Sequence, residues 1–185
     1  CVGFVIIGGI RSIAKVTDKI VPFMVIIYVT FSVIIILMNF SNIGLAFSQI
    51  ITGAFAPEAI KGGIIGVLVI GFQRAAFSNE AGIGTAPMVH GQSKTKEPIR
   101  EGLIAMLGPF IDTIVVCTLT ALAILLTGVW ETTENDGVKL TLAAFELGIP
   151  GVGKYLLMLS VLVFALSTMF TYSYYGHKCA NYIFG

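Results

Sequence analysis

Charged side chains are scarce in this chain of 185 residues. They make up 11% of it, whereas hydrophobic residues make up 56%, and the formal net charge is only +1. A soluble domain usually carries about 25% charged residues, because polar groups must cover its surface. The shortage excludes a disordered segment, a nucleic-acid binder that depends on net charge, and most soluble enzymes. It indicates an integral membrane protein whose surroundings are the lipid bilayer.

Cysteine and histidine are also rare. The three cysteines, Cys1, Cys117 and Cys179, lie far apart and match no zinc or redox spacing, so we interpret them as small apolar packing residues. The two histidines, His90 and His177, have no Cys/His cluster near them, and we expect them to be solvated at the membrane surface. An intramembrane enzyme would need a nucleophile with a base at membrane depth, and the sequence offers no such pair. We therefore expect neither an enzyme nor a bound cofactor.

Long hydrophobic stretches dominate the remainder. At a rise of about 1.5 Å per residue, a helix of about 20 apolar residues crosses the hydrocarbon core. The sequence thus predicts an all-α, polytopic transmembrane helical bundle. The apolar start of the chain is interpreted as the end of an earlier helix, at 1–10, and we expect the chain to be part of a longer membrane protein. The predicted spans are 20–40, 62–88, 102–129 and 155–176.

Basic residues favour one side of the membrane. If the spans alternate, the connections on one side hold seven Lys and Arg side chains and those on the other side hold three. The positive-inside rule places the richer side in the cytoplasm and predicts extracellular loops at 41–61 and 130–154. Apolar residues at helical spacing predict a short helix in each loop, at 42–56 and 138–147. We expect a multi-pass protein of the plasma membrane, which is the inner membrane in a Gram-negative cell.

The second predicted span differs from an ordinary lipid-facing helix. Arg74 and Glu80 lie near its middle, and Gly82 and Gly84 follow. A charge at this depth costs several kcal/mol, and each glycine weakens a helix by about 1 kcal/mol relative to alanine. Irregular backbone is tolerated there only beside protein or a water-filled cavity. We predict a discontinuous helix, broken near Ser78–Gly84, whose freed N–H and C=O groups face a polar substrate or ion.

A structural interpretation of the same residues stays open. Arg74 and Glu80 pair with each other, or with helices outside this chain, in this alternative, and the glycines allow helices to pack closely. The Gly-x-Gly pattern is not a dinucleotide fingerprint, because no strand precedes it.

Polar side chains occur in two other spans. Ser167 and Thr168 stand three and four residues after Phe164, so their hydroxyls share a face with its carbonyl and offer three oxygens to a hard cation. Alternatively, the hydroxyls bond back to the carbonyl of the preceding turn or join helices. Asp112 either faces polar partners inside the bundle or caps a helix that resumes after a proline, with help from Thr113.

The stretch Phe77-Ser78-Asn79-Glu80-Ala81-Gly82-Ile83-Gly84-Thr85-Ala86-Pro87 resembles the signature of the alanine or glycine:cation symporter family, the sodium:alanine symporters. Shorter segments spread over nearly the whole chain resemble the family too, whereas Ala75-Ala76 replaces a Gly-Leu or Gly-Met pair that is common there. The other similar segments are Gly8–Ala14, Pro22–Met24 with Tyr28, Ala54–Gly63, Phe110–Thr113, Leu125–Gly128, Phe164–Thr168 and Tyr174–Gly176.

The resemblance implies a LeuT-type inverted-repeat fold and the import of a small neutral amino acid, such as alanine or glycine, coupled to sodium or sometimes to protons. On that map 62–88 is the broken first helix of the second repeat, and the N-terminal half of the same transporter lies outside this chain. The rival functions are a passive channel and a structural membrane subunit with a non-transporting Arg-Glu pair.

The resemblance also assigns roles to residues. Those implied for substrate binding are Phe77, Ser78, Asn79, Glu80, Ala81, Gly82, Gly84 and Thr85. Those implied for sodium are Phe164, Ser167 and Thr168, and those expected to have gating or structural roles are Arg74, Asp112 and Thr113.

Overall fold

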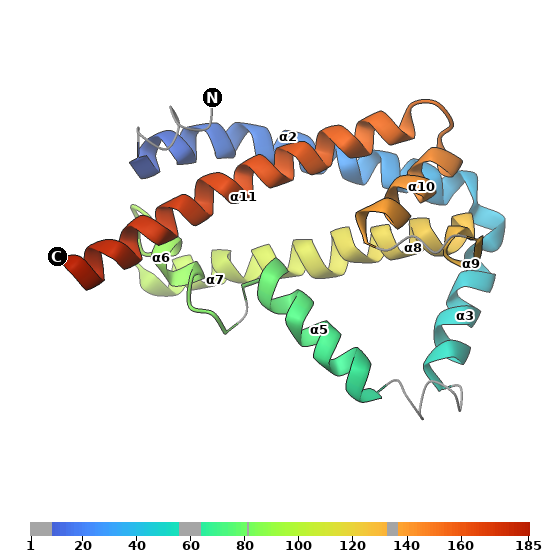
Figure 1. Ribbon diagram of the computed structural model, residues 1–185, viewed down its shortest axis with the longest axis horizontal. Helices are drawn as coiled ribbons and strands as arrows, with labels where there is room; N and C mark the ends of the chain where they lie inside the picture. The colour runs from blue at the N-terminus through green and yellow to red at the C-terminus, as the bar shows by residue number, and fades with distance from the viewer. Residues whose placement is uncertain (1–8, 56–63, 81, 133–136) are drawn as a thin grey trace. The chain divides into compact units, whose positions relative to one another are not determined.

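The computed structural model describes residues 9–55, 64–80, 82–132 and 137–185 (Figure 1). Throughout these residues the chain forms helices, turns and bends, with no strand, so the predicted all-α membrane bundle is confirmed. Most of the predicted helix end at 1–10, the predicted substrate residue Ala81, and parts of both predicted loops lie outside the described residues. The helical stretches long and apolar enough to cross a membrane are Ile13–Met38, Pro98–Thr127 and Gly153–Phe184.

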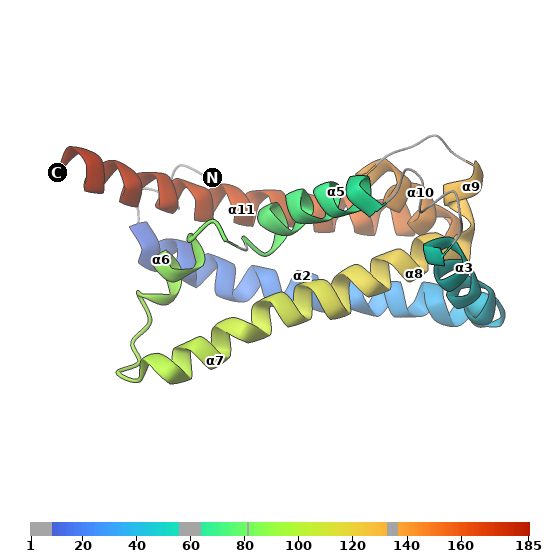
Figure 2. The ribbon, with the colours of Figure 1, turned by 90° about the horizontal axis from the view of Figure 1, so that it is seen from below.

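The chain divides into two compact units, residues 1–38 with 127–185, and residues 39–126. In the first unit two long helices lie side by side, and a shorter helix packs against both (Figures 1 and 2). The helices of this unit are α2 (Gly9–Met38), α9 (Val129–Thr132), α10 (Val138–Gly148) and α11 (Gly153–Phe184). The helix predicted at 138–147 is therefore present, and it is held by α2 and α11.

Aromatic and aliphatic side chains form the core of this first unit. Phe145 of α10 is 1% exposed, and its ring stacks on that of Tyr28 of α2 with centroids 5.5 Å apart. Ile35 is fully buried, and a Cβ built on Gly148 would come within 2.7 Å of the Ile35 side chain. A glycine is thus required where α10 approaches α2. Close van der Waals packing of these side chains holds α10 against α2.

The second unit contains the stretch that the sequence predicts to be broken. A short turn of 3₁₀-helix leads into α3, which lies where the helix of 42–56 is predicted. Further along, α7, η2 and α8 run as one continuous rod (Figure 2). The elements of this unit are η1 (Phe40–Asn42), α3 (Ile43–Phe55), α5 (Ile64–Ser78), α6 (Ala86–His90), α7 (Pro98–Pro109), η2 (Phe110–Cys117) and α8 (Thr118–Thr127).

The segment η2 is a π-helix, in which the backbone hydrogen bonds span one more residue than in an α-helix. It begins directly after Pro109, whose ring removes an N–H from the helix. A π-helical bulge absorbs such a defect without ending the helix, and bulges of this kind occur frequently at functional sites. Asp112 therefore lies within a continuous helix and does not cap a new one.

Candidate functional site

The predicted break in the second span is present, and it lies between the end of α5 at Ser78 and the start of α6 at Ala86 (Figure 1). Its backbone takes left-handed conformations, with φ of 55° at Glu80, 82° at Gly82 and 85° at Gly84. Left-handed residues cannot continue a right-handed helix, and glycine adopts them without steric cost. The Gly-x-Gly pattern thus places glycines at two positions where the backbone is left-handed.

Glu80 carries the backbone strain of this break. Among the described residues it is the one non-glycine residue with a positive φ, a conformation that costs about 1–3 kcal/mol in a non-glycine residue. Its carboxylate accepts a hydrogen bond from the Thr85 hydroxyl, and its carbonyl accepts one from the N–H of Ile83 at 3.2 Å. These bonds join the turn at Glu80 to Ile83 and Thr85 on the other side of the break.

Arg74 does not take part in this turn. Its side chain is exposed on α5 and forms no ion pair within the described ranges, whereas the Glu80 carboxylate is bonded to Thr85. The structure therefore offers no support for a pair between Arg74 and Glu80, whereas pairing with helices outside this chain stays a prediction.

Two adjacent side chains at the end of α5 bond to two adjacent side chains of η2. The Ser78 hydroxyl donates to the Asp112 carboxylate, and the Asn79 amide donates to the Thr113 hydroxyl oxygen at 2.7 Å. Both bonds join residues 34 positions apart, so they form a matched pair between the same two segments. Asp112 thus faces a polar partner at the break, which is the first of the two interpretations of its place in the span.

One acceptor at the break has no partner among the described residues. The side-chain oxygen of Asn79 is buried and accepts no hydrogen bond from the residues that the structure describes. A buried acceptor without a donor costs about 1–3 kcal/mol, so such a group is compatible with a ligand that donates to it. The other predicted substrate residues leave room nearby, since Phe77 is 72% exposed and Gly82 and Gly84 have open space around them.

The predicted sodium ligands lie in the other compact unit, on the uninterrupted helix α11. The hydroxyls of Ser167 and Thr168 donate to the carbonyl oxygen of Phe164 at 2.8 Å and 2.9 Å. The structure thus brings the three predicted oxygens together. It does so in the back-bonded geometry that the sequence left open as the alternative, and cation binding there stays a prediction.

Sequence reasoning missed a contact between α6 and α7. His90 was expected to be solvated, but its Nδ1 lies 2.8 Å from the carboxylate Oε1 of Glu101. The two side chains line a cavity of about 490 Å³ formed by α6, α7 and the loop between them. The only sequence signal for this contact is the carboxylate of Glu101 in the first turn of the next helix. No spacing rule connects residues across a loop.

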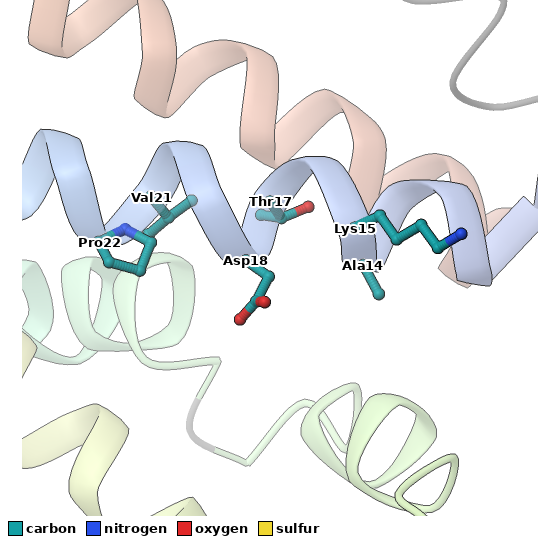
Figure 3. Close-up of a pocket in the computed structure, with 6 residues that line it drawn as sticks. All are labelled: Ala14, Lys15, Thr17, Asp18, Val21 and Pro22. Atoms are coloured by element: carbon teal, nitrogen blue, oxygen red, sulfur yellow. The ribbon is translucent and has the colours of Figure 1, made fainter.

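A further hollow lies on α2 and has a simpler explanation. All of its lining residues come from this one helix, and they include Lys15 and Asp18 (Figure 3). The Thr17 hydroxyl in this lining donates to the carbonyl of Ile13 at 2.5 Å. Because one helix face supplies the whole lining, the hollow does not enclose a small molecule.

The sequence matches the family described as the sodium:alanine symporter family over residues 1–185. An uncharacterized transporter of Haemophilus influenzae is 42% identical over 190 residues, which cover 100% of this chain and 42% of that protein. The uncharacterized transporter YflA of Bacillus subtilis is 38% identical over 191 residues, covering 100% of this chain and 41% of YflA. The sodium/alanine symporter AgcS of Methanococcus maripaludis is 42% identical over 185 residues, covering 98% of this chain and 41% of AgcS. The chain therefore spans about two-fifths of the length of these curated relatives.

Proposed function

The chain belongs to the sodium:alanine symporter family, and from this premise we propose that it is part of a secondary active transporter that imports a small neutral amino acid together with sodium. Alanine and glycine are the proposed substrates, and a proton is the alternative coupling ion. The proposed fold of the whole transporter is the LeuT-type inverted repeat, completed by an N-terminal half outside this chain. The proposed location is the plasma membrane, with the loops 41–61 and 130–154 outside the cell.

The observation that carries this proposal is the break between α5 and α6. A small zwitterion needs hydrogen-bond donors for its carboxylate and acceptors for its ammonium group. The non-helical backbone at Gly82 and Gly84 supplies N–H groups without an intrahelical partner of the regular kind, and the buried oxygen of Asn79 supplies an acceptor. The proposed binding residues are Phe77, Ser78, Asn79, Glu80, Ala81, Gly82, Gly84 and Thr85.

Asp112 and Thr113 are proposed to position this break. Their bonds to Ser78 and Asn79 fasten the last turn of α5, where the helix stops, to the π-helical segment. The bond from Ser78 ends on a carboxylate, and charge-assisted bonds of this kind are about twice as strong as neutral ones. The break is thereby held in one conformation before substrate arrives, which reduces the entropy lost on binding.

The proposed sodium site consists of the Phe164 carbonyl with the hydroxyls of Ser167 and Thr168. Sodium is a hard cation that suits neutral oxygen ligands. Both hydroxyl protons now point at the Phe164 carbonyl, so they would have to rotate away when sodium binds. Rotation of a hydroxyl keeps the helix itself unchanged, and the site can therefore load and release its ion without refolding.

Counterflow of labelled alanine tests the proposal in the complete transporter, reconstituted in vesicles with and without sodium. We expect saturable alanine exchange that depends on sodium. Transport that does not saturate would favour a passive channel. No transport at all at normal expression would favour a structural membrane subunit.

A further inference from the structure

The short helix α6 needs an external support. It has five residues, whereas an isolated helix shorter than about 12 residues is marginal in water. The left-handed glycines of the break precede it, and it ends at Gly91, whose N–H bonds the Pro87 carbonyl at 2.9 Å. Five residues form few backbone bonds of their own, so the position of this segment depends on side-chain contacts to its neighbours.

One such contact is the bond between His90 and Glu101, and the Ser93 side chain also bonds the Glu101 carboxylate. His90 is the last residue of α6, and Glu101 lies in the first turn of α7, 11 positions later in the chain. An ionised carboxylate only accepts hydrogen bonds, so the Nδ1 of His90 carries the proton of this bond. The side chain of Glu101 is 20% exposed and that of His90 is 36% exposed, so the pair is partly shielded from solvent.

Among the described residues, the neighbouring charged side chains form no ion pair with His90 or Glu101. Arg100 is next to Glu101 in sequence, but it bonds Glu97 at 3.2 Å, and both of those side chains are largely exposed. Lys94 and Lys96 are the remaining charged groups of the loop between α6 and α7, and neither lines the cavity that contains His90 and Glu101. The ionisable side chains that line this cavity are therefore His90 and Glu101.

We propose that His90 and Glu101 form a clamp that holds the segment after the break closed at its cytoplasmic end, and that transport requires this clamp to open. The inference rests on the proposed function and on the orientation assigned by the positive-inside rule. Neither residue is among the proposed binding residues, so both are proposed as positioning residues. Because its acceptor is a carboxylate, the contact is a charge-assisted hydrogen bond.

The test uses the complete transporter in vesicles and compares two activities. We expect His90→Ala to lower the sodium-driven accumulation of alanine about tenfold, because an open clamp lets cargo leak, while downhill exchange of labelled alanine stays at least as fast and the KM stays within about twofold. A variant that merely fails to fold would lose both activities. Faster leak with intact exchange is therefore specific to a gate.

Two conservative variants separate the charge from the hydrogen bond. His90→Gln can still donate to Glu101, so we expect accumulation within about twofold of the unchanged protein. Glu101→Gln should lower accumulation about threefold, since a neutral bond is weaker. Glu97→Gln is the matched control: it removes the exposed ion pair of the same helix turn and should change neither activity.

Hydrogen–deuterium exchange of the same full-length proteins provides a readout that does not need transport. Amide exchange in residues 86–93 should rise in His90→Ala and remain unchanged in Glu97→Gln. Equal exchange in these two variants, or equal alanine accumulation in them, would overturn the clamp. Absence of alanine transport by the unchanged protein would instead refute the proposed function, and the clamp would then be judged by amide exchange alone.

Discussion

Two apolar stretches of this chain carry polar side chains near their middle, yet one forms a continuous helix and the other is interrupted. In α11 the hydroxyls of Ser167 and Thr168 bond the carbonyl of their own preceding turn, so the helix satisfies them without outside help. Between α5 and α6, Glu80 lies in a left-handed turn and accepts its bond from Thr85. The difference shows that a helix can accommodate short hydroxyl side chains, because they bond to its own carbonyls. An acidic residue followed by glycines ends the helix instead.

The interrupted stretch also depends on a neighbour, whereas α11 does not depend on one for its hydroxyls. The last residues of α5 are held by Asp112 and Thr113 of a π-helical segment. Mutations of Asp112 or Thr113, which are distant in sequence, should therefore affect the break. Removal of the hydroxyls of Ser167 or Thr168 should leave the helix α11 intact.

Removal of the acid should be the most damaging single change. We expect Glu80→Ala to abolish sodium-driven alanine uptake by the complete transporter, because the turn loses its bond to Thr85 and the proposed site loses its charge. Uptake assays on vesicles, normalised to the amount of protein in the membrane, measure this. Unchanged uptake at normal expression would contradict the role of Glu80 in the break.

Loss of the distant carboxylate should rank second. Asp112→Ala leaves the Ser78 hydroxyl without its acceptor, and we expect alanine uptake to fall about tenfold, whereas Asp112→Asn keeps an acceptor and should lose less. A double-mutant cycle with Ser78→Ala measures the coupling. Thr30→Ala is a control in α2, since Thr30 bonds its own helix carbonyl at 2.7 Å. Additive losses for Ser78 and Asp112 would show that the bond does not position the break.

A test of the backbone compares glycines in the break with a glycine inside α5. Gly82→Ala should destabilise the protein by about 1–2 kcal/mol, because a left-handed conformation is strained for alanine even though the space around it is open. Gly71→Ala also meets open space, but it lies within the helix and should stabilise by about 0.5–1 kcal/mol. Thermal unfolding in detergent gives both values. A gain in Tm for Gly82→Ala would mean that the break is not left-handed.

Changes to the hydroxyls of α11 should have the smallest effect on the protein itself. We expect Ser167→Ala to raise the sodium concentration for half-maximal transport about threefold, with little change in Tm, since the helix keeps its backbone bonds. Ser160→Ala is the matched control, because Ser160 bonds the Leu156 carbonyl of the same helix at 2.9 Å but is not a proposed ligand. An equal response of the two variants to sodium would remove Ser167 from the proposed site.

Local patterns predicted the helices and the place of the break, because hydrophobic length, charge and glycine act within a few residues. The same patterns did not predict the bonds from Ser78 and Asn79 to the π-helical segment, since their partners are 34 positions away. They also assigned His90 to solvent, although it bonds Glu101 across a loop. Asp112 was left between two interpretations, and only the location of Ser78 decided between them.

The amino-acid sequence alone determined that this chain is helical, that it belongs in a membrane, and that one of its apolar stretches is broken at the glycines. Each of these follows from the composition of a short stretch of sequence. Exposing polar groups to lipid costs so much free energy that such a stretch has only one favourable arrangement. The tertiary structure alone decided which side chains satisfy the break and hold the short helix beyond it. Those contacts join residues that only the packing of separate helices brings within hydrogen-bonding distance.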